Sequence, residues 1–349
     1  MAFRDLLRGG RAAAAHAPGA APAWARPLFA GGLKPLLARD DGRVLVWAID
    51  DPGAAGTITD QFTANAEEYH RRYAASDHFE RLFRQGIEAS GIAVAPAPLI
   101  LDLGSGSGVN SIVPCLRLFP GARMVATDLS GELLAMLAGY ALDSGASGSV
   151  TCVRMDAMGE AVTPGAFDLV TGASILHHLT VPEQGLAAAA RALKPGGHAI
   201  FFEPFHGWAI MRLAFQWILA EADLRGQPLD PAADAVLRAT IVDVAARSDP
   251  DPDAAGFAAL DDKWLFSRTR IEEAARAAGF GEARFKPHGG KPTIYREMAA
   301  VQLRLGSGRD DLTLPAWADD ILATFDDALT RDAKLELMME GTIVLTKAA

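Results

Sequence analysis

Short, almost wholly apolar runs alternate with amphipathic stretches through the middle of the chain. The clearest run, residues 99–103, is apolar except for Asp102 near its carboxyl end, and this pattern is typical of a buried parallel strand. Similar runs lie within residues 123–127, 150–158, 167–179 and 193–204. Helical patterns over residues 109–119 and about 131–144 separate the first three runs. Strands that alternate with helices predict a doubly wound α/β fold.

A glycine-rich turn follows the first strand. Gly104, Gly106 and Gly108 let the backbone turn tightly and approach a ligand with no Cβ in the way. A dinucleotide-binding turn would place a third glycine at Val109 or Ser111, according to the frame, and neither position fits. The Gly-Lys-Ser/Thr ending of a phosphate-binding loop is also missing.

The order Asp-x-Gly-x-Gly-x-Gly from Asp102 to Gly108 resembles motif I of the class I S-adenosylmethionine-dependent methyltransferases. Further segments match this family in order up to residue 204. Asp128 ends the second strand, where an acidic side chain can accept both hydroxyls of a ribose. The resemblance implies a mostly parallel, seven-stranded sheet flanked by helices, with helical insertions after the fifth and sixth strands.

The resemblance also implies the cofactor, S-adenosyl-L-methionine, with S-adenosyl-L-homocysteine as product. Asp156 would bind the adenine amino group, with Met155 or Ala157 beside the ring. Two alternatives remain open: Asp128 caps the next helix, or Asp156 makes a local turn. The implied cofactor-binding residues are Tyr69, Tyr73, Asp102, Gly104, Ser105, Gly106, Asp128, Leu129, Asp156, Ala157, Ala173 and His177.

The chain before the first strand divides near residue 56. Residues 1–56 are interpreted as a loose tail and a small β-containing appendage, whose best strand pattern lies at residues 43–49. A segment with Tyr69 and Tyr73 follows, and a tyrosine face near a sulfonium would add about 0.5–2 kcal/mol of cation–π attraction. The alternative is that the two tyrosines, four residues apart, pack one helix face onto the core.

The remaining residues, 57–349, are predicted to form one methyltransferase domain. Its cofactor-binding core covers residues 95–204. A helical insertion over residues 205–266, rich in large apolar side chains, is expected to cover the substrate. The last two strands and a second insertion occupy residues 267–349.

The composition of the chain limits the classes of binding partner that we expect. The chain has 349 residues, half of them hydrophobic, so it can bury a large core. Its net charge of −10 argues against a broad nucleic-acid-binding face. Cys115 and Cys152 both fall inside predicted core elements, which indicates free thiols in a reducing compartment and no zinc site.

No segment is long and apolar enough to span a membrane, and residues 1–25 lack the apolar core of a secretory signal. We therefore expect a cytoplasmic protein with a small-molecule substrate, no nucleic-acid partner and no metal. A homodimer is one option for its assembly.

Histidine is the usual base near neutral pH if the methyl acceptor is an alcohol or a phenol. The histidines to weigh are His177, His178, His206 and His288. We predict His206, His178 and Glu203 as the catalytic residues. A packing or cofactor-facing role for His177 and His178 is the alternative.

The acceptor class is narrowed by what stands after the fourth strand. Residues 173–176 read Ala-Ser-Ile-Leu, not the Asn/Asp-Pro-Pro-Phe/Tyr motif of the family members that methylate amino groups of bases or glutamine amides. A small or conjugated, partly hydrophobic acceptor is favoured, with O-methylation ahead of N or C. The alternatives are a non-catalytic protein that binds S-adenosylmethionine as a partner or sensor, and an RNA methyltransferase.

Overall fold

The computed structural model describes residues 20–51 and 76–349. They fall into two compact units, and each is described by itself. The first unit holds the described residues up to 203 together with residues 272–285 and 342–349. The second unit holds residues 204–271 and 286–341.

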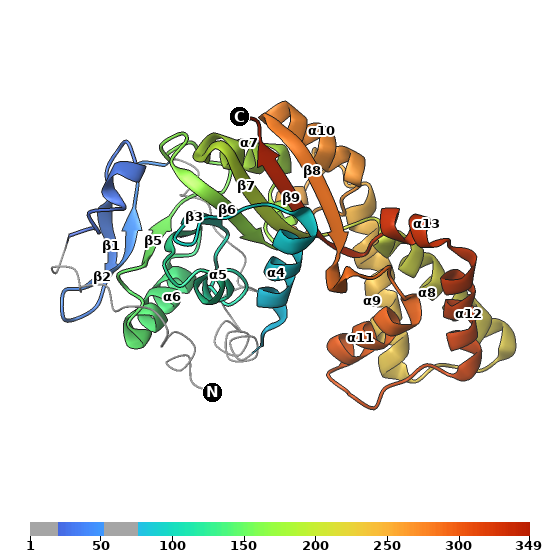
Figure 1. The fold of residues 1–349 in the computed structure, drawn as a ribbon. Helices are drawn as coiled ribbons and strands as arrows, with labels where there is room; N and C mark the ends of the chain where they lie inside the picture. Colours follow the sequence, from blue (N-terminus) through green and yellow to red (C-terminus); the bar gives the residue numbers. More distant parts are fainter. Residues whose placement is uncertain (1–19, 52–75) are drawn as a thin grey trace. The chain divides into compact units, whose positions relative to one another are not determined.

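One sheet organises the first unit, and nine strands of the described residues take part in it (Figure 1). In order across the sheet they are β1 (Lys34–Ala38), β2 (Val44–Ala48), β5 (Val150–Arg154), β4 (Arg123–Asp128), β3 (Leu99–Leu103), β6 (Phe167–Ala173), β7 (Leu193–Pro204), β9 (Glu340–Lys347) and β8 (Phe280–Pro287). The neighbours from β2 through to β7 pair in parallel, whereas β1 runs antiparallel to β2.

The predicted α/β class is confirmed. The sheet has nine strands rather than the predicted seven, because β1 and β2 of the N-terminal appendage join its β5 edge. The predicted boundary near residue 56 lies outside the described residues.

Helices cover both faces of the sheet. The helices α4 (His78–Ser90), α5 (Ile112–Leu118) and α6 (Gly131–Ser144) lie on one face, and α7 (Pro182–Ala192) and α10 (Arg268–Ala278) on the other (Figure 1). The α5 helix begins later than predicted, because residues 106–111 form turns and bends. The α6 helix has the predicted bounds: Ser130 Oγ accepts from the N–H of Leu133 at its start (3.1 Å), and Gly145 ends it at φ +79°.

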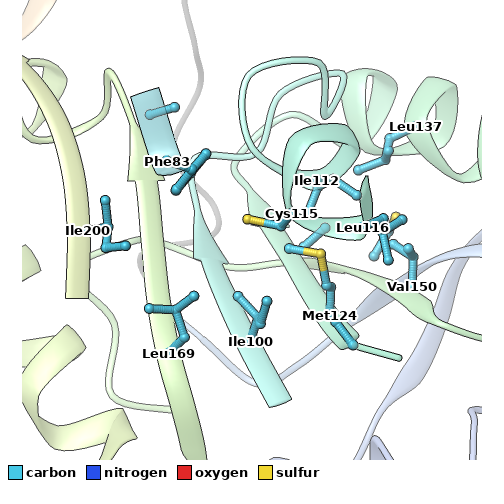
Figure 2. Close-up of a cluster of buried hydrophobic side chains, with 14 of the residues drawn as sticks. Phe83, Ile100, Ile112, Cys115, Leu116, Met124, Leu137, Val150, Leu169 and Ile200 are labelled. Atoms are coloured by element: carbon cyan, nitrogen blue, oxygen red, sulfur yellow. The ribbon is translucent and has the colours of Figure 1, made fainter. Parts of the chain in front are cut away.

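A continuous apolar core fills the space between the sheet and α4, α5 and α6 (Figure 2). Phe83 of α4 packs edge-on against Phe202 of β7, with ring centroids 4.6 Å apart. Each fully buried side chain of this size contributes roughly 1.5–3 kcal/mol. Cys115 and Cys152 are free and buried, as predicted.

The second unit is helical. It contains α8 (Gly207–Arg225), α9 (Pro231–Ser248), α11 (Tyr295–Ser307), α12 (Ala316–Ala328) and α13 (Arg331–Glu336). Helices α8 and α9 lie within the helical insertion predicted over residues 205–266. Phe215 of α8, Leu237 of α9, Tyr295 of α11 and Leu322 of α12 are buried in one apolar cluster, so two stretches far apart in sequence share a single core.

Across the described parts of the chain, none of the helices combines the length and the apolar character that a membrane span requires.

Candidate cofactor site

The parallel strands β3, β4, β5 and β6 end at the same edge of the sheet. Four features lie at or just after these ends, in strand order: the glycine-rich turn, Asp128, Asp156 and Ser174. Ligands bind at such an edge in doubly wound folds. The structure therefore brings the main sequence-predicted cofactor residues of the first unit together.

The glycines of the turn all have positive φ angles, +66° at Gly104, +51° at Gly106 and +80° at Gly108. A Cβ at Gly104 would lie 2.4 Å from the side chain of Ile175, and one at Gly108 would lie 2.5 Å from that of Leu137. A Cβ at Gly106 would meet nothing within 4 Å. Packing thus requires the outer two glycines, whereas the open face of Gly106 leaves backbone accessible to a ligand.

Asp102 lies beneath this turn and has no exposed surface. Its carboxylate accepts from the hydroxyls of Ser105 (2.6 Å), Ser111 (2.5 Å) and Thr171 (2.6 Å). Burial raises the pKa of Asp102 to about 6, although the three hydroxyls act in the opposite direction. The side chains of Asp102 and Ser105 therefore support the turn from below instead of lining the site.

Asp128 ends β4 and is half-buried. Its Oδ2 accepts from the N–H of Gly106 and its Oδ1 from the N–H of Ser130, both at 2.8 Å. Burial raises the pKa of this carboxyl, and these backbone donors act in the opposite direction. The alternative that Asp128 caps the next helix is wrong, because the cap is Ser130. Each carboxylate oxygen can accept more than one hydrogen bond, so both can still receive ligand hydroxyls. Leu129 is half-buried beside it.

Asp156 follows β5 and is half-buried. Its Oδ1 accepts from the N–H of Met158 (2.9 Å), so the local turn considered as the alternative is present. Burial raises the pKa of this carboxyl. Met155 and Ala157 on either side are buried.

Ser174 is a feature that the sequence did not reveal. It follows the buried Ala173 at the end of β6, is exposed, and has φ +62°, the one positive φ at a non-glycine among the described residues. Such a conformation costs of order 1–3 kcal/mol and clusters at functional sites. Serine gives no sequence signal for it.

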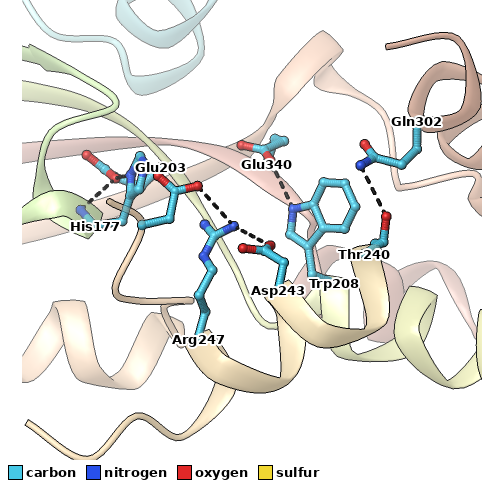
Figure 3. A network of polar contacts seen from close by, with 9 residues as sticks. His177, Glu203, Trp208, Thr240, Asp243, Arg247, Gln302 and Glu340 are labelled. Carbon is cyan, nitrogen blue, oxygen red and sulfur yellow. Dashed lines mark hydrogen bonds and ion pairs between the residues drawn. The ribbon is translucent and has the colours of Figure 1, made fainter. Parts of the chain in front are cut away.

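Glu203, near the end of β7, holds the turn after β6 (Figure 3). Its Oε1 accepts from the N–H groups of Ile175 (3.1 Å) and Leu176 (2.8 Å). Its Oε2 accepts from the N–H of His177 (3.2 Å) and from His177 Nδ1 (2.6 Å). Glu203 has no exposed surface. The prediction of a catalytic role for Glu203 is therefore corrected to a positioning role, because its carboxylate is occupied by the turn.

The other predicted residues are placed as follows. The His178 ring is half-buried, and its centroid lies 4.0 Å from that of the buried His177 ring. His206 belongs to the second unit, at the start of α8, and burial lowers its pKa. Tyr69 and Tyr73 lie outside the described residues.

Residues 100–197 match a family whose description is "Methyltransferase domain". This match covers the strands and turns that form the site. These residues form a class I S-adenosylmethionine-dependent methyltransferase domain. The resemblance seen in the sequence is confirmed, and S-adenosyl-L-methionine is the cofactor of this class.

Curated relatives of this methyltransferase domain match over the same region. A ubiquinone biosynthesis O-methyltransferase of Idiomarina loihiensis is 33% identical over 102 residues, 29% of this chain and 40% of that protein. The one of Chromobacterium violaceum is 34% identical over 102 residues, 29% of this chain and 42% of that protein. An uncharacterized protein of Synechococcus, syc1184_c, is 32% identical over 138 residues, 39% of this chain and 33% of that protein. The matches thus span less than half of each relative.

Solved structures with similar folds include the [4+2]-cyclase SpnF, at 18% identity and a TM-score of 0.45, over 77% of this chain and 81% of that chain. Phosphoethanolamine N-methyltransferase 2 of Haemonchus contortus matches at 16% identity and a TM-score of 0.45, over 84% of this chain and 61% of that chain.

Proposed function

We propose that this protein transfers a methyl group from S-adenosyl-L-methionine to a small or conjugated, partly hydrophobic acceptor, with oxygen as the favoured nucleophile. The observation that carries the proposal is the pairing of Gly106 with Asp128. An open glycine backbone lies hydrogen-bonded to a carboxylate at the ends of two neighbouring parallel strands. This pair can receive a nucleoside, with backbone on one side and a hydroxyl acceptor on the other.

The residues present fit the cofactor. The face of Gly106 that a Cβ would fill is open, so the turn can lie close to it. Asp128 would accept the ribose hydroxyls, and Asp156 with Ala157 would hold the adenine. Tyr69 and Tyr73 are proposed to cover the cofactor, as the resemblance implies.

When bound, S-adenosyl-L-methionine supplies a methyl group on a sulfonium, an activated leaving group. The residues of the chain then need mainly to align the acceptor and exclude water. Glu203 contributes by fixing the turn that carries His177 and His178. His206 is proposed as a base, because its lowered pKa keeps the ring uncharged at neutral pH, ready to accept a proton. His178 is the second candidate.

The acceptor class rests on charge and on the second unit. A net charge of −10 disfavours a nucleic-acid substrate, and the exposed apolar side chains of α8, Leu213 and Trp217, suit a partly hydrophobic one. The ubiquinone O-methyltransferase relatives agree with an oxygen acceptor on a hydrophobic molecule. We also propose that the protein works in the cytoplasm.

The first test is calorimetric titration of S-adenosyl-L-homocysteine into the full chain. We expect micromolar binding that Asp128→Ala weakens about tenfold or more, since a hydrogen bond to a charged group contributes about 1.5–3 kcal/mol. Asp143→Ala, which removes an exposed carboxylate from α6, is the matched control and should bind as the wild type does. The proposal would be contradicted if the wild type did not bind S-adenosyl-L-homocysteine, or if it bound NADH more tightly.

A transfer assay then separates catalysis from binding alone. Labelled S-adenosyl-L-methionine is offered with phenolic and with amine acceptors of similar apolar size. Product on the phenols supports the proposed O-methylation, and product on the amines alone contradicts it. Binding without turnover on any acceptor would favour the non-catalytic alternative.

A further inference from the structure

The N-terminal appendage, residues 20–51, packs against strand β5, whose carboxyl end leads into Asp156. Strand β2 pairs with β5 over residues 46–48, with Val46 opposite Cys152. Leu28 accepts from the N–H of Thr163 (2.8 Å), beyond the turn that follows β5. The appendage is therefore anchored at β5 itself and again after its following turn.

Asp51, just beyond β2, contacts that turn directly. Its Oδ2 accepts from the backbone N–H of Asp156 at 3.0 Å. A Cβ at Gly159 would lie 2.8 Å from the same oxygen and 2.9 Å from the carbonyl oxygen of Asp156. Gly159 thus lets the turn close tightly around the Asp51 carboxylate.

The contact continues from strand end to strand end. Next to Asp156, Met155 donates its N–H to the carbonyl of Asp128 (3.1 Å). Asp128 in turn accepts from the N–H of Gly106 (2.8 Å). One row of hydrogen bonds therefore joins the ends of β2, β5, β4 and β3, and it runs through the residues that the proposed cofactor would contact.

We propose that Asp51 is a positioning residue for the cofactor site, and that the appendage fixes the turn at Asp156 in the conformation that receives the nucleoside. The inference rests on the proposed function. It gives residues 20–51 a purpose that neither the family match, which begins at residue 100, nor the sequence pattern provides. The contact needs an acceptor oxygen and not a charge. The Asp51 carboxylate in fact repels the charged form of Asp156. Burial is the main cause of the raised Asp156 pKa, and this repulsion adds to it.

The test compares S-adenosyl-L-homocysteine affinity by calorimetry in four forms of the full chain. Asp51→Ala should weaken binding about five- to tenfold, because the Asp156 N–H loses its acceptor. Asp51→Asn should stay within about twofold of the wild type, since an amide oxygen also accepts. Asp50→Ala is the matched control: it removes the adjacent carboxylate, which is exposed and pairs with Lys34 at 2.8 Å.

A double-mutant cycle separates positioning from general destabilisation. In an Asp156→Ala background, Asp51→Ala should add less than about a twofold loss, because the two residues act through one turn. An equal loss in both backgrounds would overturn the inference, and so would wild-type affinity of Asp51→Ala. If the wild type itself fails to bind S-adenosyl-L-homocysteine, the result contradicts the proposed function. Wild-type binding together with an unaffected Asp51→Ala refutes only the positioning role.

Discussion

Two fully buried carboxylates, Asp102 and Glu203, hold the turns at the strand ends, and each accepts hydrogen bonds from at least one residue far away in the sequence. Asp102 is the extreme case, since three hydroxyls converge on it and no part of it reaches solvent. The raised pKa means that the folded protein binds a proton there more readily than the unfolded chain. At neutral pH, the charged form of Asp102 therefore lowers the free energy of unfolding.

This destabilisation by the charged form of Asp102 should be visible in the pH dependence of stability. The folded pKa of about 6 lies above the unfolded value near 3.9, so the contribution of Asp102 to stability falls as pH rises from about 4 to about 6 and stays low above. The difference corresponds to about 3 kcal/mol. Urea unfolding of the wild type and Asp102→Asn should therefore show the wild type gaining about that much relative to the variant between neutral pH and about pH 3. A gap that does not change with pH would contradict it.

The sequence predicted where these carboxylates stand but not what they do. Asp128 could be placed from strand order alone, because the end of a parallel strand next to a glycine-rich turn faces the ligand edge. Asp102 and Glu203 could not be assigned in this way. Their donors Thr171 and Ile175 lie 69 and 28 residues away, and only the assembled sheet brings them within reach.

At the level of elements, the turn after β6 depends on one side chain from β7. Glu203 accepts from three consecutive backbone N–H groups, those of residues 175–177. Backbone donors buried without an acceptor are costly, so this turn has its conformation only while Glu203 is in place.

Glu203→Ala should lower the free energy of unfolding by about 3–5 kcal/mol, because it removes a buried carboxylate and leaves its donors unpaired. Amide hydrogen exchange at residues 175–177 should lose protection with it. Glu273→Ala, an exposed glutamate on α10, serves as control. Unchanged protection in Glu203→Ala would show that the turn is held by other contacts.

Among the elements, α5, α6 and the central strands followed from the sequence, whereas the β1 edge of the sheet did not. Strand β2 lies inside the alternating stretch at residues 43–49, as expected. Strand β1 has all five residues exposed, and its sequence, Lys-Pro-Leu-Leu-Ala, does not alternate between apolar and polar positions. Pro35 within it is tolerated because edge strands can spare a backbone donor. Strand β1 belongs to the sheet because it pairs with β2, and the sequence of β1 alone does not predict this pairing.

At the scale of the whole molecule, the described residues form one apolar core under the sheet and another among α8, α9, α11 and α12. They share no residue. The second core draws on both insertions, so neither insertion would bury its apolar face alone.

Phe215→Ala should therefore weaken the helical unit and leave the cofactor unit able to bind. The truncation of a fully buried phenylalanine should cost about 3–5 kcal/mol in urea unfolding followed by circular dichroism. Affinity for S-adenosyl-L-homocysteine should stay within about twofold under native conditions. Parallel loss of affinity in a protein that remains folded would refute the independence of the two cores.

The shared helical core has a consequence for synthesis on the ribosome. The chain leaves the sheet after residue 203, returns, and leaves again after residue 285, so α8 is made well before its partner α11. From Arg225 to Tyr295 there are 70 residues, which at about 5–20 residues per second is roughly 4 to 14 s. During that interval the apolar side of α8, including Met211, Phe215 and Ile218, lacks the part of its core that α11 and α12 later supply. The nascent protein should thus be a client for chaperones that bind exposed apolar helices, and slower translation between the two insertions would lengthen that exposure.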